Sequence, residues 1–395
     1  MKEIYLDNAA TTSLDPEVLE AMLPWLKGGY GNASSVHTMG RQAKVMIEDV
    51  RDLFADFIGA RSSEIYFTSG GTEADNFAVK GITFSKFSEG LFTGSVRPHI
   101  ISSAIEHSAI IDTLEYLKQR FDVEVTYLTP DRFGYIDPND AEKAIRPETI
   151  LITIMHSNNE LGVINDTLPF ARMAHNHNIP FFTDAVQSLG KVSLDVKQME
   201  CDAASFSGHK IYGPKGIGAL FLKKDTLIDK FMHGGKQERD RRGGTENTAA
   251  IAGFGKAIEL LKSRMKSDIE QYSKLRAQFV KAIGETFGSN VIFNSPGCGS
   301  GSGDVPYLPN IVSMSFNPES VKTDADTLLI KLDMKKIAVS SGSACTSGSV
   351  QPSHVLKAIG YDDRSARSSL RVSFGRFNTV GDVDTLVEAL KDIIS

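Results

Sequence analysis

The sequence predicts an α/β fold with a mainly parallel sheet, and two observations carry this prediction. Short apolar runs recur along the first half of the chain, and stretches with helical periodicity separate most of them. Short, nearly continuous apolar runs are typical of strands that are buried on both faces, as in parallel sheets. The length of 395 residues also allows two or three domains, at about 150 residues for each.

The runs that we expect to form strands in this part of the chain are Glu64–Thr68, His99–Ser102, Val123–Leu128, Ile150–Met155, Pro180–Thr183 and Gly218–Leu222. Helical patterns lie between most of these runs, for example over Ala104–Phe121 and Asp166–Asn178. Alternation of strands and helices indicates a parallel sheet that is covered by helices on both faces.

The pattern changes after Gly253. Apolar residues recur every three or four positions from Ile258 to Ile283, which predicts a long amphipathic helix that links two domains. The next segment, Asn294–Asn310, is rich in Gly, Ser and Pro and predicts a flexible loop.

The rest of the chain returns to regular structure, with a predicted strand over Ile311–Phe316 and predicted helices near Asp324–Asp333 and Val380–Ile394. We therefore expect a large α/β domain and a smaller α+β domain. Their expected bounds are residues 14–260 for the large domain, and residues 1–13 together with 261–395 for the small one.

The composition is that of a soluble globular protein, with 41% hydrophobic and 23% charged residues and a net charge of −6. Because no basic stripe is present, nucleic acid is not an expected partner. We see no signal peptide and no apolar run of about 18 residues, so we expect no membrane segment. Only three cysteines occur, which excludes a disulfide framework and favours a reducing cytoplasm. The nine histidines form no metal-binding pattern, so no metal is expected.

The first motif that suggests a binding site is Thr68–Glu73, at the end of a predicted strand and the start of a helix. Gly70 and Gly71 let backbone amides approach an anion, and the helix N-terminus adds free N–H groups. A phosphate fits there, with the Thr72 hydroxyl as a further donor. The alternative is an ordinary helix cap, in which Thr72 and Asp75 are first-turn residues.

Two further motifs place a carboxylate and an amine after strands. Asp184 ends an apolar strand, at the edge where open α/β sheets bind ligands, and can pair there with a cationic ring nitrogen. The alternative is that Asp184 caps a helix. Lys210 follows small polar residues and a histidine and precedes a Gly-Pro turn. Partial desolvation would lower the pKa of Lys210 and make it a nucleophile, whereas the alternative is a surface lysine in a turn.

The three cysteines differ in their surroundings. Cys345 lies among Ser and Gly residues in Ser340–Gly348, which favours an exposed and reactive thiol. Cys201 is expected to be buried and inert, and Cys298 to be exposed in a loop without a catalytic neighbour. We expect the basic run Arg239–Arg242 to be a solvated loop.

Together these motifs resemble the NifS/IscS-like cysteine desulfurases, which are fold-type I pyridoxal phosphate (PLP) enzymes of the class V aminotransferase group. The resemblance runs from Tyr5 to about Phe377, and the segments SFSGHKIYGPKG and SSGSACTS are its most specific parts. It also includes the segments Gly31–Ser35, Glu106–His107, His156–Gly162 and Ser369–Arg376.

The resemblance implies a role for each matched residue. Lys210 matches the lysine that forms a Schiff base with PLP, and Asp184 matches the aspartate that pairs with the pyridine nitrogen. His107 matches the histidine that stacks on the cofactor ring and is a candidate acid/base. The other implied cofactor-binding residues are Gln187, at the phenolic oxygen, and Gly71, Thr72, Ser207, His209 and Thr245, around the phosphate.

The resemblance also implies partners. Thr245 matches a threonine that reaches the phosphate of the partner subunit, so a homodimer is expected. Asn159 and Arg371 match the groups that hold the carboxylate of the substrate, L-cysteine. A planar guanidinium suits this bidentate contact.

The implied reaction converts L-cysteine to L-alanine. Lys210 takes the Cα proton, His107 accepts the proton of the substrate thiol, and the Cys345 thiolate attacks the substrate sulfur. Cys345 then carries a persulfide to an acceptor, such as an iron–sulfur scaffold or a tRNA-thiolation protein. The family's assembly enzymes dock the scaffold through a longer C-terminal tail, so docking by that route is not expected for a chain that ends at Ser395.

Three alternatives start from the same residues. A class V aminotransferase that acts on a small amino acid would need Lys210, Asp184 and Arg371 but not Cys345. A degenerate PLP-fold protein that only relays sulfur would lack a cofactor ligand, yet Lys210, Asp184 and Gln187 are all present. A Rossmann dehydrogenase fits the strand–helix alternation, but the chain lacks its Gly-rich fingerprint.

Overall fold

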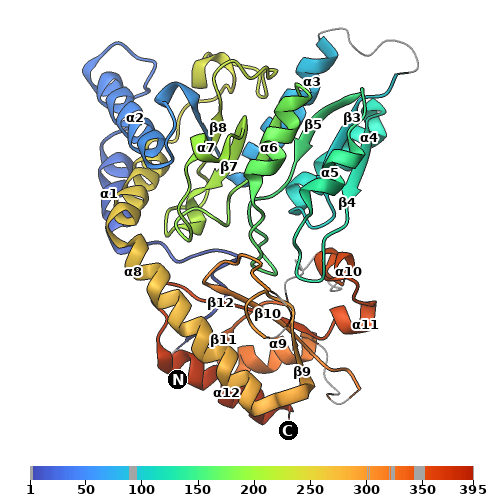
Figure 1. Cartoon of the computed structure of the whole chain (residues 1–395). Helices are drawn as coiled ribbons and strands as arrows, with labels where there is room; N and C mark the ends of the chain where they lie inside the picture. The colour runs from blue at the N-terminus through green and yellow to red at the C-terminus, as the bar shows by residue number, and fades with distance from the viewer. Residues whose placement is uncertain are drawn as a thin grey trace.

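The computed structural model describes residues 3–88, 96–299, 301, 303–319, 321, 325–341 and 352–394. Figure 1 shows a larger part with the main sheet above a smaller part, and one long helix that runs from the first into the second. Both ends of the chain lie in the smaller part (Figure 1). Among the described residues, no helix has the length and apolar character that a membrane crossing requires.

The large sheet has seven strands within the described residues, and β8 is the exception to its parallel arrangement. In spatial order the strands are β2 (Ile65–Thr68), β8 (Gly218–Leu222), β7 (Ala203–Ser207), β6 (Phe181–Asp184), β5 (Thr149–Thr153), β3 (His99–Ser103) and β4 (Glu124–Leu128). The strands from β7 to β4 are parallel, whereas β8 is antiparallel to both of its neighbours. The prediction of a mainly parallel α/β sheet is confirmed.

All six predicted strands of this sheet form, with ends within two residues of the predicted ones. The sequence pattern does not predict β7, although all five of its residues are buried. Small and hydroxyl-bearing side chains dominate Ala203–Ser207, so the segment lacks the bulky apolar run that marks a buried strand. The tertiary structure buries this strand between β6 and β8.

Side chains of the large sheet alternate between two cores, as the pleat of a strand requires. In β6, for example, Phe181 enters one core and Phe182 the other. The helices on the first face are α1 (Pro16–Lys27), α2 (Thr38–Phe57), α5 (Pro138–Ala144), α6 (Thr167–Asn176) and α7 (Val196–Met199). The helices on the second face are α3 (Gly71–Ser88) and α4 (Ser108–Phe121). Helices therefore cover both faces, as predicted.

The smaller part surrounds a separate apolar core. Its elements are the antiparallel sheet β12 (Ser369–Ser373), β10 (Ile311–Phe316) and β9 (Val291–Phe293), the parallel pair β1 (Ile4–Tyr5) and β11 (Ile337–Ala338), and the helices α9 (Ala325–Met334) and α12 (Val380–Ile394). The predicted strand Ile311–Phe316 and the two predicted helices are confirmed within one residue.

The long helix α8 (Thr248–Phe287) has 40 residues and a length of roughly 60 Å. Its first half packs into the core of the larger part, through residues such as Phe254 and Leu261. Its second half packs into the smaller core, through residues such as Leu275 and Phe279. The predicted linking helix is confirmed.

Two short helices connect the parts in a second way. Although α10 (His354–Ala358) and α11 (Asp363–Ala366) follow α8 in the sequence, they lie against the core of the larger part. Val355 and Leu356 are each 1% exposed there. The division of the chain at residue 260 stays a prediction. These two helices belong to the predicted small domain by sequence, yet they pack against the core of the larger part.

A buried ion cluster fastens the two parts beside α8. The Arg376 guanidinium donates to Asp15 at 2.8 Å and, through two nitrogens, to Asp268 at 2.8 and 3.0 Å. Both carboxylates are at most 4% exposed, and the guanidinium lies 4.3 Å from the ring centre of Tyr212.

We expect Arg376→Met to lower the free energy of unfolding by about 3–5 kcal/mol, because it removes a cation from two buried carboxylates. The control is Arg172→Met, which breaks an exposed pair with Glu200 and should cost under about 1 kcal/mol. Urea denaturation of both variants and the wild type measures the difference. Equal losses in the two variants would contradict the structural role of the Arg376 cluster.

Candidate active site

A cavity of about 540 Å³ lies at the carboxyl ends of the parallel strands, between the larger and smaller parts. The predicted site residues that line it are Gly71, Thr72, His107, Asn159, Asp184, Gln187, Ser207, His209, Lys210 and Arg371. They come from strand ends, helix starts and turns that are far apart in the sequence. Parallel strands bring these ends to one edge of the sheet, which explains why they meet.

Lys210 ends a short 3₁₀ turn, Gly208–Lys210, that follows β7. Its Nζ donates to the backbone carbonyls of Ala9 and Ala10, the latter at 2.8 Å. Burial lowers the pKa of Lys210 to about 8, and the positive charge of Arg371 acts in the same direction. The amine is therefore partly uncharged near neutral pH, which is what a nucleophile or a proton acceptor requires.

Asp184 is the last residue of β6 and is 6% exposed. Its Oδ1 accepts a bond from Val186 N at 2.8 Å, but a turn follows rather than a helix, so the helix-cap alternative is wrong. Burial raises the pKa of Asp184, and the nearby His107 and Lys210 oppose that rise. A cationic group in the cavity would relieve the cost of burying this carboxylate.

His107 is the N-cap of α4, and its Nδ1 accepts a bond from Ala109 N at 3.1 Å. This bond assigns the ring proton of neutral His107 to Nε2. The ring keeps exposed surface toward the cavity, yet desolvation by the surrounding protein lowers its pKa. His107 can therefore accept a proton once its Nδ1 is released, or donate the proton on Nε2.

The start of α3 forms a cradle for an anion. The helix begins at Gly71, where an added Cβ would lie 2.7 Å from Val186 and 3.7 Å from Ser207, so only a small residue leaves this space open. Ser207 Oγ is buried and has no hydrogen-bond partner among the described residues. Thr72 is exposed on the cavity wall. Free N–H groups and two hydroxyls at a helix N-terminus suit a phosphate.

Gln187 and His209 complete the side of the cavity nearest the N-terminal segment. Gln187 Nε2 donates to the carbonyl of Ala9 at 2.9 Å, while its buried Oε1 lacks a partner within the described part of the chain. His209 Nδ1 lies 3.1 Å from Thr11 Oγ1, and burial lowers the pKa of His209 to about 4. His209 is therefore neutral at physiological pH, and its ring serves as a hydrogen-bonding group rather than a charge.

Arg371, in β12, brings a buried cation from the smaller part to the cavity. Its Nη1 donates to the backbone carbonyl of Asn159 at 2.9 Å, and its Nη2 forms an ion pair with Asp7 at 2.7 Å. The Nε–H group has no partner among the described residues. Arg371 thus retains a donor, and an anionic ligand would compete with Asp7 for the guanidinium.

The structure does not place two of the predicted residues in the cavity. Thr245 is exposed in the loop before α8 and is not among the lining residues. Cys345 lies outside the described residues. The prediction of a solvated basic run is wrong for Arg242. This residue is partly buried in an ion pair with Glu73 at 2.7 Å.

The other two cysteines are both buried free thiols. Cys201 fulfils its prediction, because burial raises the pKa of its thiol far above the usual range. The prediction of an exposed Cys298 is wrong. Its sulfur lies 2.9 Å from Arg276 Nη2 and is 5% exposed, since the start of the Gly-rich loop folds back onto α8.

Three titratable residues at the site are not among the predicted site residues. Asp7 pairs with Arg371 and lines the cavity. Lys191 is buried, and its Nζ donates to the Lys210 carbonyl at 3.0 Å; burial lowers its pKa to about 7. Glu106 is fully buried directly before His107. Asp7 and Glu106 lie within segments that resemble the cysteine desulfurases, and this could have marked them as site residues. Nothing in the sequence marks Lys191 as buried.

The model of the aminotransferase class-V family matches residues 4–386. The chain belongs to this family. An IscS cysteine desulfurase from Dictyoglomus turgidum is 42% identical over 393 residues, covering 100% of this chain and 95% of that protein.

Solved structures agree with this membership of the class-V family. A structure described as a NifS-like protein has a TM-score of 0.88 and 32% identity, and the match covers 99% of each chain. A structure of SspA in complex with cysteine has a TM-score of 0.80 and 37% identity, over 96% of this chain and 100% of that one. The predicted fold-type I architecture is confirmed.

Glu106 gives a test of the buried charges in this class-V site. Ser103 Oγ and Met155 N donate to its Oε1 at 2.6 and 2.8 Å, and burial raises its pKa to about 8. Between about pH 5 and pH 8 the unfolded chain releases this proton while the folded chain holds it, so the wild type loses stability as pH rises.

We expect Glu106→Gln, which has no proton to lose, to gain in unfolding free energy relative to the wild type by up to about 1.4 kcal/mol per pH unit in this window. Urea denaturation of the cofactor-free proteins at pH 5, 6, 7 and 8 measures the trend. The exposed Glu20→Gln serves as the control and should show no trend. A difference that is constant across the four pH values would rule out a proton held by Glu106.

Proposed function

We propose that this chain, a cysteine desulfurase, uses PLP to convert L-cysteine to L-alanine and passes the sulfur to Cys345 as a persulfide. The observation that carries the proposal is the single cavity in which Lys210, Asp184 and Arg371 meet. These residues supply an amine of lowered pKa, a buried carboxylate and a buried guanidinium.

The cavity residues fit PLP. We assign Asp184 to the ring nitrogen, because a protonated pyridine supplies the cation that this buried carboxylate lacks. The space beside Gly71 and the unpartnered hydroxyl of Ser207 support a phosphate at the start of α3, with Thr72 and His209 as further ligands. Gln187 lines the cavity, and its Nε2, which donates to the Ala9 carbonyl at 2.9 Å, would donate to the phenolic oxygen of PLP.

Each of the remaining residues then has a task. When bound, PLP serves as an electron sink that stabilises negative charge at the substrate Cα. Lys210 Nζ removes the Cα proton, which its lowered pKa favours. Arg371 and Asn159 hold the substrate carboxylate, with the carboxylate in place of Asp7 on the guanidinium. His107 takes the proton of the substrate thiol.

The sulfur-transfer step involves Cys345. Its thiolate attacks the substrate sulfur, the C–S bond breaks with its electron pair going to the carbon, and protonation at that carbon yields alanine. Cys345 is four residues from Ser341, which lines the cavity, so the chain can span at most about 14 Å between them. This short connection supports Cys345 as the sulfur acceptor. A persulfide formed there would pass to an iron–sulfur scaffold or a tRNA-thiolation protein.

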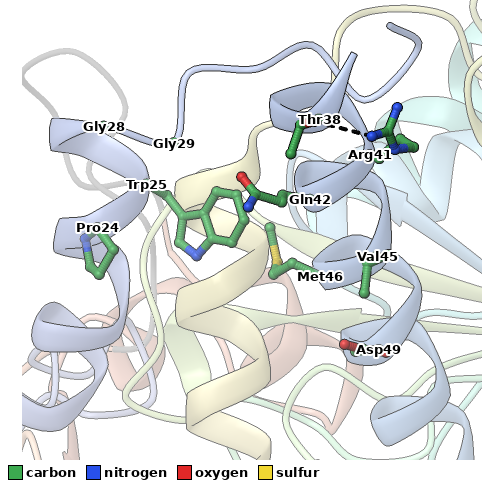
Figure 2. A pocket seen from close by; sticks show the side chains of 10 residues that line it. All are labelled: Pro24, Trp25, Gly28, Gly29, Thr38, Arg41, Gln42, Val45, Met46 and Asp49. Atoms are coloured by element: carbon green, nitrogen blue, oxygen red, sulfur yellow. Dashed lines mark hydrogen bonds between the residues drawn. The ribbon is translucent and has the colours of Figure 1, made fainter. Parts of the chain in front are cut away.

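We also propose that the protein is a homodimer that works in the cytoplasm. Leu26, Tyr30 and Val36 are 62%, 80% and 88% exposed, and covering them would remove apolar surface from water. Figure 2 shows an open groove in which Trp25 of α1 faces residues of α2. A second copy over α1 and α2 would cover the groove, and sedimentation should then give twice the chain mass of 43.0 kDa. Two buried free thiols fit a reducing compartment.

The first test is the formation of alanine from L-cysteine by the PLP-loaded protein with a thiol reductant. We expect equal amounts of alanine and sulfide from the wild type and at least a hundredfold loss in Cys345→Ala, because no other thiol in the described structure lines the cavity. Cys201→Ala is the control and should keep its activity, since that thiol lies in the core away from the cavity.

Undiminished alanine from Cys345→Ala would exclude the persulfide mechanism. If neither protein forms alanine from L-cysteine while PLP stays bound, an aminotransferase acting on a small amino acid becomes the better interpretation.

A second test concerns the carboxylate at the ring nitrogen. Asp184→Asn keeps the shape of the side chain but loses the charge that favours a protonated ring, so we expect alanine formation to fall at least a hundredfold. The control, Asp137→Asn, changes the exposed cap of α5 and should retain full activity. If Asp184→Asn keeps more than half of the wild-type rate, Asp184 does not act at the ring.

A further inference from the structure

The helix that begins at the anion cradle carries a carboxyl group one turn further along. Asp75 follows Gly71 by four positions and Thr72 by three, which places the three residues on one face of α3, and all of them line the cavity. Asp75 is 1% exposed, and its Oδ1 has no hydrogen-bond partner among the described residues. A carboxyl group that is buried in this way needs either a cation or a proton.

The large sheet directs two polar side chains toward α3, which packs on both β6 and β7. In β6, Asp184 is two positions beyond Phe182, which belongs to the core under α3. In β7, Ser205 is two positions beyond Ala203, which belongs to the same core. Because side chains alternate along a strand, Asp184 and Ser205 also face α3, and they are paired in the register of the two strands. Asp75, Asp184 and Ser205 therefore converge between α3 and the sheet.

The two acids differ in the charges that surround them. Burial raises the pKa of Asp184, but His107 and Lys210 oppose that rise and stabilise its anion. Burial also raises the pKa of Asp75, and the charged groups that act on it, Asp184 and Glu106, are acidic and raise the pKa further. Two carboxyl groups that are buried close together do not both ionise, so one proton stays on the pair. The surrounding charges place that proton on Asp75.

We propose that Asp75 is a positioning residue of the PLP site: as a neutral carboxylic acid it supplies an O–H donor to the polar group of Asp184 and Ser205, and the two acids together present one negative charge to the cavity. The Asp184 carboxylate then carries the charge that pairs with a protonated ring nitrogen. The Asp75 donor stabilises this charge, whereas an ionised Asp75 would repel it. Asp75 thus acts on the cofactor through Asp184.

The inference rests on the proposed function, and PLP binding tests it first. Titration of the cofactor-free protein with PLP, followed by the absorbance of the bound cofactor, gives the dissociation constant. Asp75→Asn is neutral, as the protonated acid is, and keeps a donor, so its Kd should stay within about threefold of the wild type. Asp75→Ala has no donor, so its Kd should rise at least about tenfold. The rates of alanine formation at saturating PLP should fall in the same order.

The matched control is Thr83→Ala on the same helix. Thr83 is fully buried, and its Oγ1 donates to the Val79 carbonyl at 2.7 Å. It lies about two turns beyond Asp75 and does not line the cavity. Its replacement removes a buried polar side chain from α3 without touching the two acids, so we expect the Kd for PLP to stay within about twofold of the wild type.

The proton on Asp75 has a second signature, which needs no PLP. The unfolded chain releases this proton near the ordinary aspartate pKa of about 4, whereas the folded chain holds it, so the wild type loses stability as pH rises above that value. Asp75→Asn has no proton to lose. Its unfolding equilibrium constant relative to the wild type should therefore fall between pH 5 and pH 7, by up to about tenfold per pH unit. Urea denaturation of the cofactor-free proteins measures this trend, and Thr83→Ala should show none.

Three results would overturn the proposal: Asp75→Asn binds PLP as weakly as Asp75→Ala, Asp75→Ala binds as tightly as the wild type, or Thr83→Ala loses as much affinity as Asp75→Ala. If Asp75→Ala does not fold, the pH series with Asp75→Asn decides, and a ratio of unfolding constants that does not change with pH would count against a proton on Asp75. A failure of the proposed function is recognised separately, because the wild type would then bind no PLP or form no alanine.

Discussion

The chain from Asp7 to Thr12 is bonded to both parts of the molecule, and the site depends on this double attachment. On the side of the smaller part, Asp7 pairs with Arg371 at 2.7 Å. On the side of the larger part, Thr12 N donates to the carbonyl of His209 at 2.9 Å, next to Lys210. A strand of the small sheet and a turn of the large sheet are thereby held at one cavity. The segment therefore has a structural reason to carry a fixed motif, besides any contact with ligands.

The cavity collects charges that the protein alone does not balance. Asp75, Glu106 and Asp184 are buried close together, and burial raises the pKa of each. Burial also lowers the pKa values of Lys210, which lines the cavity, and of Lys191, which is bonded to the Lys210 carbonyl. Such an arrangement costs stability in the free protein and is repaid when a ligand of matching charge binds. The buried carboxylate of Asp184 fits the proposed PLP, whose protonated ring nitrogen would supply a matching cation.

Prediction from the sequence succeeded where one segment carries its own signal. Bulky apolar runs marked six strands of the large sheet, and the spacing of apolar residues marked α8. It failed for β7 and for Cys298, because small residues carry no burial signal and a Gly-rich loop gives no sign of folding back onto a helix. The helix-cap alternative for Asp184 was likewise excluded by the turn after β6, which local composition does not distinguish from a helix start.

The sequence by itself determined the family, the α/β class and ten of the residues that line the cavity, because these follow from local patterns and from motifs of fixed composition. Only the tertiary structure decided which groups touch. It paired Arg371 with Asp7, set Lys191 behind Lys210, and bound Ser353 to Glu160 across 193 positions of sequence. Contacts of this kind depend on the packing of two sheets and one long helix, and the free energy of burying a charge depends on every neighbour at once.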